Sequence, residues 1–134
     1  MPMINYSESN SIYVQIADII RQRIFAEEYK RSERLQSVRD LAAEFEVNPN
    51  TMQRALSELE REGFLVSERT AGRYVTQDEE LLASRRAEYI EKLVGRFAKE
   101  ISVYRIEPSA IISMLDRAIK NLNGGTQHGG AIEN

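Results

Sequence analysis

The sequence predicts a mainly α-helical protein with a small β-hairpin, in which an N-terminal winged helix-turn-helix is followed by a short two-helix region. Three observations lead to this fold class. Three helix-like patterns occupy the chain up to Gly63, two strand-like runs follow, and helical periodicity returns from Glu79. We therefore expect a winged helix-turn-helix domain over residues 1–77, a helical region over 78–123 and a disordered tail over 124–134.

Composition restricts the functions that the chain can have. Its 134 residues correspond to one small domain with an appendage, which leaves little room for a large catalytic cleft. The chain has no cysteine and one histidine, His128, which excludes disulfides, thiolate metal sites and ordinary histidine-based catalysis. We expect no enzyme, no metal and no cofactor. Neither a secretory signal nor an apolar run of about 20 residues is found, so we expect a cytoplasmic protein without membrane contact.

The first helix is predicted from about Ser11 to Glu28, because isoleucines recur three and four positions apart between Ile12 and Ile24. This spacing places the isoleucines on one face of a helix. A polar stretch follows, and Leu35 is expected in a very short extended segment.

Two further helices follow at close spacing. Ser37 can cap the second helix, and Asp40 three residues later completes a capping-box pattern. Asn48-Pro49 supplies a cap and a proline at the first position of the third helix, which ends at Gly63. The residues expected to be buried on the two helices are Val38, Leu41, Ala42, Phe45, Met52, Ala55, Leu56 and Leu59.

Two strand-like runs, Leu65 to Arg69 and Arg73 to Thr76, are separated by Thr70-Ala71-Gly72 and predict a hairpin. The hairpin would be the wing of a winged helix. Two helices joined by a tight turn, the second capped with its first turn outward, are typical of the helix-turn-helix, which places a recognition helix in the major groove of DNA.

The C-terminal part carries a heptad-like seam, in which apolar residues lie alternately four and three apart from Ala83 to Tyr104. A second apolar stripe runs from Ile111 to Leu122. A helix of about 25 residues is about 38 Å long, more than a domain of about 70 residues can cover, so we expect dimerisation rather than packing within one chain. The expected dimerisation residues are Ile90, Val94, Phe97, Ile101 and Tyr104.

Four runs of the sequence, in one order and at matching spacing, resemble the GntR family of bacterial transcription regulators. The resemblance covers about Ile12 to Val75, and Asn-Pro-Asn-Thr with the brief helical C-terminal part is similar to the small YtrA-type subfamily. The four runs are Ile12 to Ala17, Leu35 to Ala42, Val47 to Leu56 and Leu59 to Leu65.

The resemblance implies that DNA is contacted by the arginine of the Ser-Val-Arg segment, the first turn of the third helix and the tip of the wing. The exposed side of the third helix and the basic residues beside these segments extend that set. The expected DNA-binding residues are Arg34, Arg39, Asn48, Asn50, Thr51, Gln53, Arg54, Ser57, Arg69, Thr70, Ala71, Gly72 and Arg73.

Residue chemistry suggests different roles within this set. Gln53 can pair with adenine through two hydrogen bonds, and Thr51 has the right size for a phosphate contact. Arg39 can bind a phosphate or a guanine edge, and the sequence leaves that choice open. Arginines at the wing can enter a narrow minor groove or contact the backbone. The alternative for each residue is a solvated surface position.

The charge balance does not by itself predict DNA binding. Residues 1–77 carry ten basic and twelve acidic side chains, a net charge of −2. DNA binding therefore requires that the basic groups be segregated on one face, and the predicted DNA-facing segments do contain Arg34, Arg39, Arg54, Arg69 and Arg73.

The sequence therefore indicates a sequence-specific DNA-binding transcription regulator, interpreted as a homodimeric repressor of an inverted-repeat, double-stranded DNA operator. The resemblance to YtrA-type regulators implies control of an ABC transporter operon. An effector is not identified, and a small-molecule site is expected at the dimer interface, because two helices offer few concave walls. The alternative is a winged-helix module that binds protein or RNA.

Overall fold

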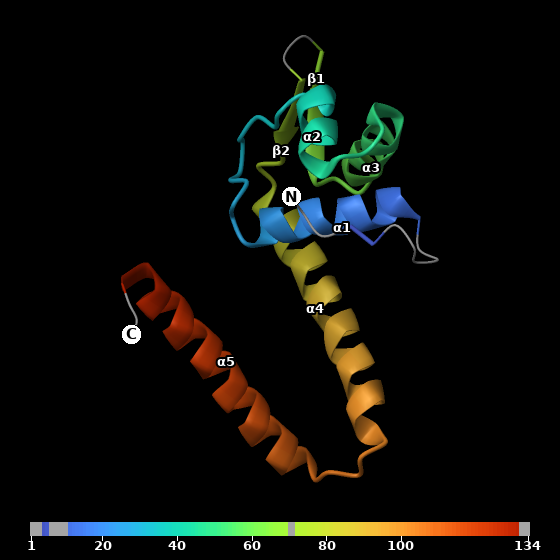
Figure 1. The fold of residues 1–134 in the computed structure, drawn as a ribbon. Coiled ribbons are helices and arrows are strands. Elements are labelled where there is room, and N and C mark those ends of the chain that lie inside the picture. The colour runs from blue at the N-terminus through green and yellow to red at the C-terminus, as the bar shows by residue number, and fades with distance from the viewer. Residues whose placement is uncertain (1–3, 6–10, 70–71, 132–134) are drawn as a thin grey trace. The chain divides into compact units, whose positions relative to one another are not determined.

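The computed structural model describes residues 4–5, 11–69 and 72–131, with side chains described up to residue 124. The predicted fold class is confirmed: the chain is mainly α-helical and has one β-hairpin (Figure 1). Residues 1–88 and 89–134 form two compact units, here named unit 1 and unit 2. The elements in chain order are α1 (Ile12–Phe25), α2 (Val38–Phe45), α3 (Pro49–Arg61), β1 (Leu65–Glu68), β2 (Gly72–Val75), α4 (Glu79–Ser102) and α5 (Pro108–Ala131).

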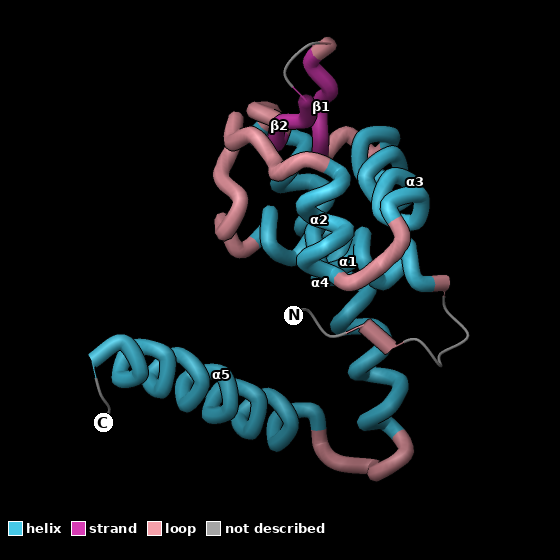
Figure 2. Tube along the Cα trace, turned by 45° about the horizontal axis from the view of Figure 1, so that its top comes forward, coloured by secondary structure: helices cyan, strands magenta, loops and turns pink. Residues whose placement is uncertain are grey.

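Unit 1 is built around one apolar core to which α1, α2, α3 and the hairpin all contribute. The helix α3 packs against α1, α2 and β1, and a short turn joins it to α2 (Figure 2). The predicted buried faces are confirmed, except that Val38 is half-buried. Fully burying a leucine, isoleucine, phenylalanine or methionine side chain stabilises a fold by about 1.5–3 kcal/mol. The helical core residues are Ile16, Ala17, Ile20, Ile24, Leu41, Ala42, Phe45, Met52, Ala55, Leu56 and Leu59.

The predicted caps hold the helix-turn-helix in place. The Ser37 hydroxyl accepts a hydrogen bond from the backbone N–H of Asp40 at 3.1 Å, and the Asn48 side-chain oxygen accepts one from the N–H of Asn50 at 2.7 Å. Pro49 occupies the first turn of α3. Glu46 ends α2 in the left-handed conformation, with φ of 56°. The turn before α3 is therefore tight, and the first turn of α3 begins at a fixed point.

The wing is a two-stranded hairpin with an isolated β-bridge to the linker beside it. Leu65 pairs with Val75 and Glu68 with Gly72 in an antiparallel register. Arg34 forms an isolated bridge with Tyr74. The backbone N–H of Leu35 donates to the carbonyl of Arg73 at 2.9 Å. The backbone N–H of Val75 donates to the carbonyl of Glu33, also at 2.9 Å. The predicted short extended segment at Leu35 is confirmed, and it ties the base of the wing to the linker that follows α1.

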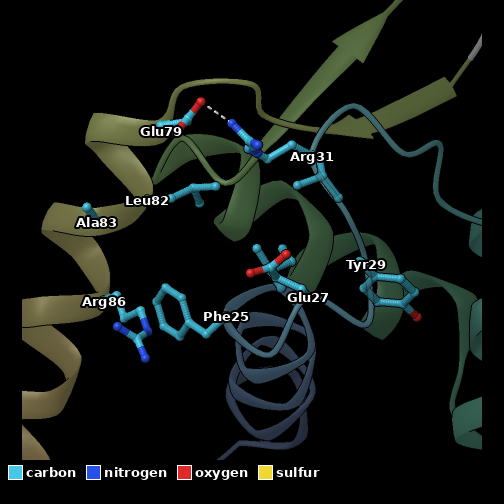
Figure 3. Close-up of a pocket in the computed structure, with 10 residues that line it drawn as sticks. Phe25, Glu27, Tyr29, Arg31, Glu79, Leu82, Ala83 and Arg86 are labelled. Carbon is cyan, nitrogen blue, oxygen red and sulfur yellow. Dashed lines mark ion pairs between the residues drawn. The ribbon is translucent and has the colours of Figure 1, made fainter.

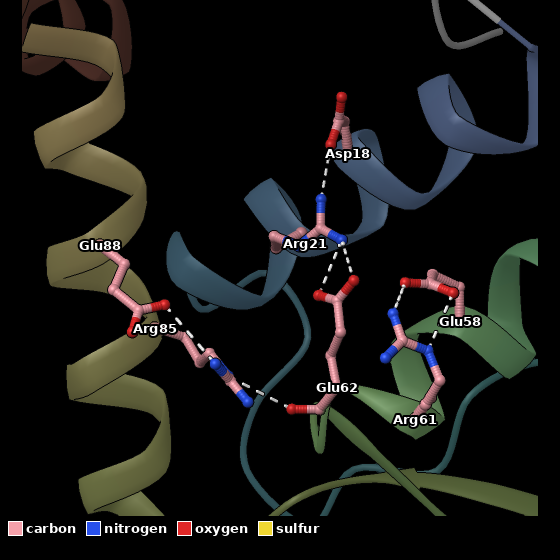
Figure 4. A network of polar contacts seen from close by, with 7 residues as sticks. All are labelled: Asp18, Arg21, Glu58, Arg61, Glu62, Arg85 and Glu88. Atoms are coloured by element: carbon pink, nitrogen blue, oxygen red, sulfur yellow. Dashed lines mark hydrogen bonds and ion pairs between the residues drawn. The ribbon is translucent and has the colours of Figure 1, made fainter. Parts of the chain in front are cut away.

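The beginning of α4 packs on the rest of unit 1. Asp78 caps the helix by accepting a hydrogen bond from the N–H of Leu81 at 3.0 Å. A Cβ atom on Gly63, where φ is +94°, would lie 2.9 Å from Cδ2 of Leu81. The Nε of Arg85 donates to the carbonyl of Glu62 at 3.3 Å (Figure 4). These contacts explain why unit 1 extends past residue 77 to Glu88.

Unit 2 consists of the rest of α4, the connection 103–107 and α5. The helix α4 ends at Ser102 because the N–H groups of Tyr104 and Arg105 turn back to the carbonyls of Ile101 and Ser102, and Arg105 has φ of 55°. The predicted seam extended the helix to Tyr104, and this part of the prediction is wrong: Tyr104 lies beyond the helix end.

The helix α5 continues to Ala131, so the structure places helix where the sequence predicted a disordered tail from Gly124. Glycine costs about 1 kcal/mol relative to alanine within a helix, but it keeps the N–H that proline lacks and so does not interrupt the hydrogen-bond ladder. Residues 132–134 of the predicted tail lie outside the described residues. Among the helices of the described chain, none has the length and apolarity required to cross a membrane.

Candidate nucleic-acid interface

The outer face of α3 is polar and exposed. Asn50, Gln53, Arg54 and Ser57 are exposed and Thr51 is half-buried, whereas the opposite face is buried in the core. This division follows from the helical period, because positions three and four apart share one side of a helix. The structure therefore brings together the five side chains that the sequence predicted on the recognition helix.

Asn48 has a second role beside that prediction. Its side chain is exposed, but its oxygen is engaged as the cap of α3. The cap fixes where the first turn of α3 starts, which sets the direction of Asn50 and Thr51.

Arginines of unit 1 fall into two groups. In the first group the charge is compensated by an acidic neighbour: Arg21 pairs with Asp18 and Glu62, and Arg61 pairs with Glu58 (Figure 4). In the same way, Arg23 pairs with Glu44 at 3.0 Å.

Arg34, Arg39, Arg54, Arg69 and Arg86 form the second group. Within the described part of the chain, these five exposed side chains take part in no ion pair. All but Arg86, which lies on α4, belong to the predicted DNA-facing segments. The predicted DNA-facing segments thus contain cations whose charge no neighbouring carboxylate compensates, as an anionic partner requires.

Arg73 differs from the other predicted arginines. Its side chain is 16% exposed, and its Nε donates to the Glu60 carboxylate at 3.0 Å. Hydrogen bonds from Ser67 and then from Arg73 lower the pKa of the Glu60 carboxyl, against the opposing effect of desolvation. The pair joins the wing to α3, and sequence reasoning missed it because Glu60 and Arg73 lie on different elements.

The tip of the wing is only partly described. Arg69 is exposed, and Gly72 has φ of +91°, a conformation that favours glycine. A Cβ atom on Gly72 would lie 3.5 Å from the Nε of Arg34, so the linker arginine and the wing lie close together. Thr70 and Ala71, both predicted to contact DNA, lie outside the described residues.

Tyr13 is a neighbour of the recognition helix that sequence reasoning did not predict. The guanidinium carbon of Arg54 lies 4.0 Å from the centroid of the Tyr13 ring. Tyr13, Asn50, Thr51 and Arg54 line an open groove of about 380 Å³ where the beginnings of α1 and α3 meet. The only signal in the sequence was the position of Tyr13 next to the isoleucine stripe of α1.

A separate cavity of about 440 Å³ lies in unit 1 between the end of α1 and the first turns of α4 (Figure 3). Phe25, Tyr29 and Leu82 contribute apolar walls, and Arg31 and Glu79 form an ion pair on one side. Its volume is within the range of small-molecule sites. The sequence-based expectation placed any ligand site at a dimer interface and did not anticipate this cavity.

Comparison with known proteins identifies the family. Residues 12–75 match the bacterial regulatory proteins of the gntR family. A GntR family transcriptional regulator from Listeria monocytogenes has 33% sequence identity and a TM-score of 0.76, with 84% of this chain and 98% of that chain covered. The chain belongs to the GntR family. It is thus a transcription regulator with a DNA-binding helix-turn-helix, which confirms the family and the class of function predicted from the sequence.

Two curated relatives of this GntR-family regulator come from Bacillus subtilis (strain 168). The uncharacterized HTH-type transcriptional regulator YhcF is 33% identical over 96 residues, 72% of this chain and 79% of that protein. The HTH-type transcriptional repressor YtrA is 36% identical over 78 residues, 58% of this chain and 60% of that protein. The similarity to YtrA supports the YtrA-type resemblance noted in the sequence.

The predicted dimerisation residues of the regulator lie in a solvent-exposed position in the single chain. Val94 is 58% exposed and Phe97 40%, Ile90 and Tyr104 are also exposed, and Ile101 is half-buried. The apolar stripe of α5 is exposed as well, at Leu115, Ile119 and other positions. No side chain described between residues 89 and 124 is buried.

Proposed function

We propose that the regulator is a homodimeric repressor that binds an inverted-repeat DNA operator, with one α3 helix per half-site. The observation that carries the proposal is the exposed polar face of α3, together with the exposed Arg34, Arg39, Arg54 and Arg69 of the predicted DNA-facing segments, which form no ion pair in the described structure. A capped recognition helix with such uncompensated cations suits a polyanionic groove.

The proposed contacts are of two kinds: contacts to phosphates position the protein on DNA, and contacts to base edges recognise the sequence. Thr51, in the first turn of α3, contacts a phosphate, and the exposed Arg34 and Arg69 contribute phosphate or minor-groove contacts. Gln53 and Arg54, further along the exposed face, reach base edges, and Asn50 and Ser57 complete that face. Arg39, at the start of α2, binds a phosphate or a guanine edge.

The dimer is proposed to form through unit 2. The 24 residues of α4 span about 36 Å, and the seam of Ile90, Val94, Phe97 and Ile101 occupies the C-terminal half of that length. An exposed apolar stripe of this kind is stabilised when a second copy covers it, and two-fold symmetry lets the same surface serve both chains. A two-fold dimer in turn calls for an inverted repeat.

Repression is proposed from the similarity to the repressor YtrA. A dimer bound at a promoter would block polymerase, and the YtrA-type resemblance makes an ABC transporter operon the expected target. Such a regulator acts in the cytoplasm. A small-molecule effector, if the regulator has one, would bind at the dimer interface or in the cavity between α1 and α4.

The decisive experiment selects bound fragments from the source genome at one fixed salt concentration. We expect enrichment of one inverted repeat, whose half-site spacing also reports the dimer. The matched control is the double variant Asn50→Ala/Gln53→Ala, which leaves the buried face of α3 intact and should lose the enrichment. Selection of no DNA by the folded wild-type protein would contradict the proposal and favour a module that binds protein or RNA.

A further inference from the structure

We propose that Tyr13 is a positioning residue for DNA recognition, because its ring fixes the direction in which the Arg54 guanidinium leaves α3. The inference rests on the proposed DNA-binding role of α3. It adds to the interface a residue from α1, which no part of the helix-turn-helix pattern includes.

The first step is the geometry of the pair. Tyr13 is the second residue of α1, half-buried and packed against the core of unit 1. Arg54 is exposed on α3, and its guanidinium carbon lies 4.0 Å from the centre of the Tyr13 ring. Such a distance is well inside the range of a cation–π contact. An anchored ring therefore lies against a solvent-exposed cation.

Arg54 differs from the other arginines that lie over aromatic rings. Arg21 lies 5.5 Å from the Phe64 ring and Arg23 lies 5.2 Å from the Phe45 ring, but both are also ion-paired with carboxylates. Arg54 has the shortest of these ring distances and, within the described chain, no ion pair. The tyrosine thus holds this guanidinium without neutralising its charge.

The contact with the Tyr13 ring leaves the N–H donors of the Arg54 guanidinium available. Stacking occupies the face of the planar group and leaves the N–H donors at its edge directed outward. A carboxylate partner would instead occupy those donors. The arrangement keeps Arg54 available for a base edge while reducing the rotamer freedom that binding would otherwise remove.

The last step is the setting of the pair. Tyr13 and Arg54 line the same open groove as Asn50 and Thr51, which are proposed to meet DNA. Loss of the ring should therefore change the contact made by Arg54 and leave the contacts of Gln53 unchanged. A role of Tyr13 in packing alone predicts no such selectivity.

The experiment uses full-length Tyr13→Leu, Tyr13→Phe, Arg54→Ala and the double variant Tyr13→Leu/Arg54→Ala, with the selected operator and a panel of single-base changes at fixed salt. Tyr13→Leu should weaken binding about two- to five-fold and relax preference at the position that Arg54→Ala relaxes. Tyr13→Phe keeps the ring and should match the wild type. The double variant should bind no worse than Arg54→Ala, because the two substitutions remove the same contact with DNA.

Two results would overturn the inference while leaving the proposed function intact. One is an unchanged base-preference profile in Tyr13→Leu, and the other is a double variant whose loss equals the product of the two single losses. Failure of the wild-type protein to enrich any repeat would instead overturn the proposed function, and the positioning role with it.

A measurement on the free protein keeps the inference testable without any variant that must fold. The Arg54 side-chain protons should show an upfield ring-current shift in the NMR spectrum of the wild type, retained in Tyr13→Phe. Unshifted Arg54 resonances in the wild type would show that the guanidinium does not stack, and would overturn the proposal.

Discussion

The two compact units of the chain distribute their apolar side chains in opposite ways. Unit 1 buries Leu41, Phe45, Leu59 and the rest of its core at 0–8% exposure, whereas unit 2 buries no side chain described up to residue 124. Both units nevertheless have apolar residues at helical spacing. A stripe of this kind stabilises a structure only when another surface covers it. Unit 1 thus contains its own core, whereas the apolar side chains described in unit 2 are left uncovered in the single chain.

The largest expected effect comes from the core of unit 1. Phe45 is fully buried, so Phe45→Ala should lower the free energy of unfolding by about 3–5 kcal/mol, because it removes apolar contacts and leaves a cavity. Urea denaturation followed by circular dichroism measures the change. A loss below about 1 kcal/mol would mean that the core of unit 1 is not the source of its stability.

A charge in the exposed seam should have a different effect. Phe97→Asp should convert the dimer to a monomer and reduce operator affinity by about 10²-fold or more, since two linked half-sites become independent. Lys99→Asp, on the same exposed helix but off the seam, is the matched control. Analytical ultracentrifugation and titration with operator DNA decide the outcome. A folded Phe97→Asp protein with an unchanged dimer mass would show that the seam is not the dimer contact.

Two neighbouring residues of α3 separate positioning from reading. Thr51→Ala should weaken binding to every operator variant by a similar factor, since a phosphate contact carries no sequence information. Gln53→Ala should cost about 1–3 kcal/mol at one base pair and relax preference there alone. Both variants are titrated against single-base operator changes at one salt concentration. Equal weakening of all sequences by Gln53→Ala would move specificity to Asn50, Arg54 or Arg39.

A smaller effect is expected at the contact between the wing and α3. The folded-state pKa of Glu60 is lowered from the ordinary 4.5, so its contribution to stability is present above pH 4.5 and is lost as the pH falls through the lowered value. Glu60→Gln should cost less than about 1 kcal/mol at pH 7, because the pair is partly exposed.

The pH dependence provides the check for this pair. Thermal unfolding of the wild type and of Glu60→Gln should differ most near neutral pH, and the two curves should converge below pH 4.5. Glu68→Gln, which removes an exposed carboxyl from β1, is the matched control. A constant difference between wild type and Glu60→Gln down to acid pH would contradict a role for the carboxylate.

The smallest effect is expected at the C-terminal end. Deleting Gly124 to Asn134 should leave the melting temperature and DNA affinity unaltered, because a glycine-rich segment offers little apolar surface to bury. Differential scanning fluorimetry and operator titration measure both. A fall of several degrees would mean that this part of α5 contributes to the stability of unit 2.

Local patterns predicted much of unit 1. The buried face of α3 and the caps at Ser37 and Asn48 follow from helical spacing and from the chemistry of the first turn, and all were predicted. The helix α1 ends at Phe25, three residues before the predicted Glu28, because Glu27 adopts φ of 61°. No residue type in that stretch indicates the turn.

Contacts between residues far apart in the chain could not be predicted from the sequence. Gly63 was predicted as a helix end, but its close approach to Leu81 depends on how α4 packs. The contacts of Glu60 with Arg73 and of Tyr13 with Arg54 likewise join elements whose relative placement no single-sequence pattern specifies. The exposed face of α3 was therefore predictable from the sequence, whereas the contacts of Arg73 and Arg54 with other elements were not.

Sedimentation equilibrium of the wild-type chain at several concentrations tests most directly whether unit 2 is completed by a second copy. The exposed apolar seam predicts a mass of twice the 15.4 kDa chain, with dissociation only on dilution. A mass of 15.4 kDa at every concentration, for a protein with an intact helical spectrum, would contradict the account, since the apolar face of unit 2 would then have no second copy to cover it.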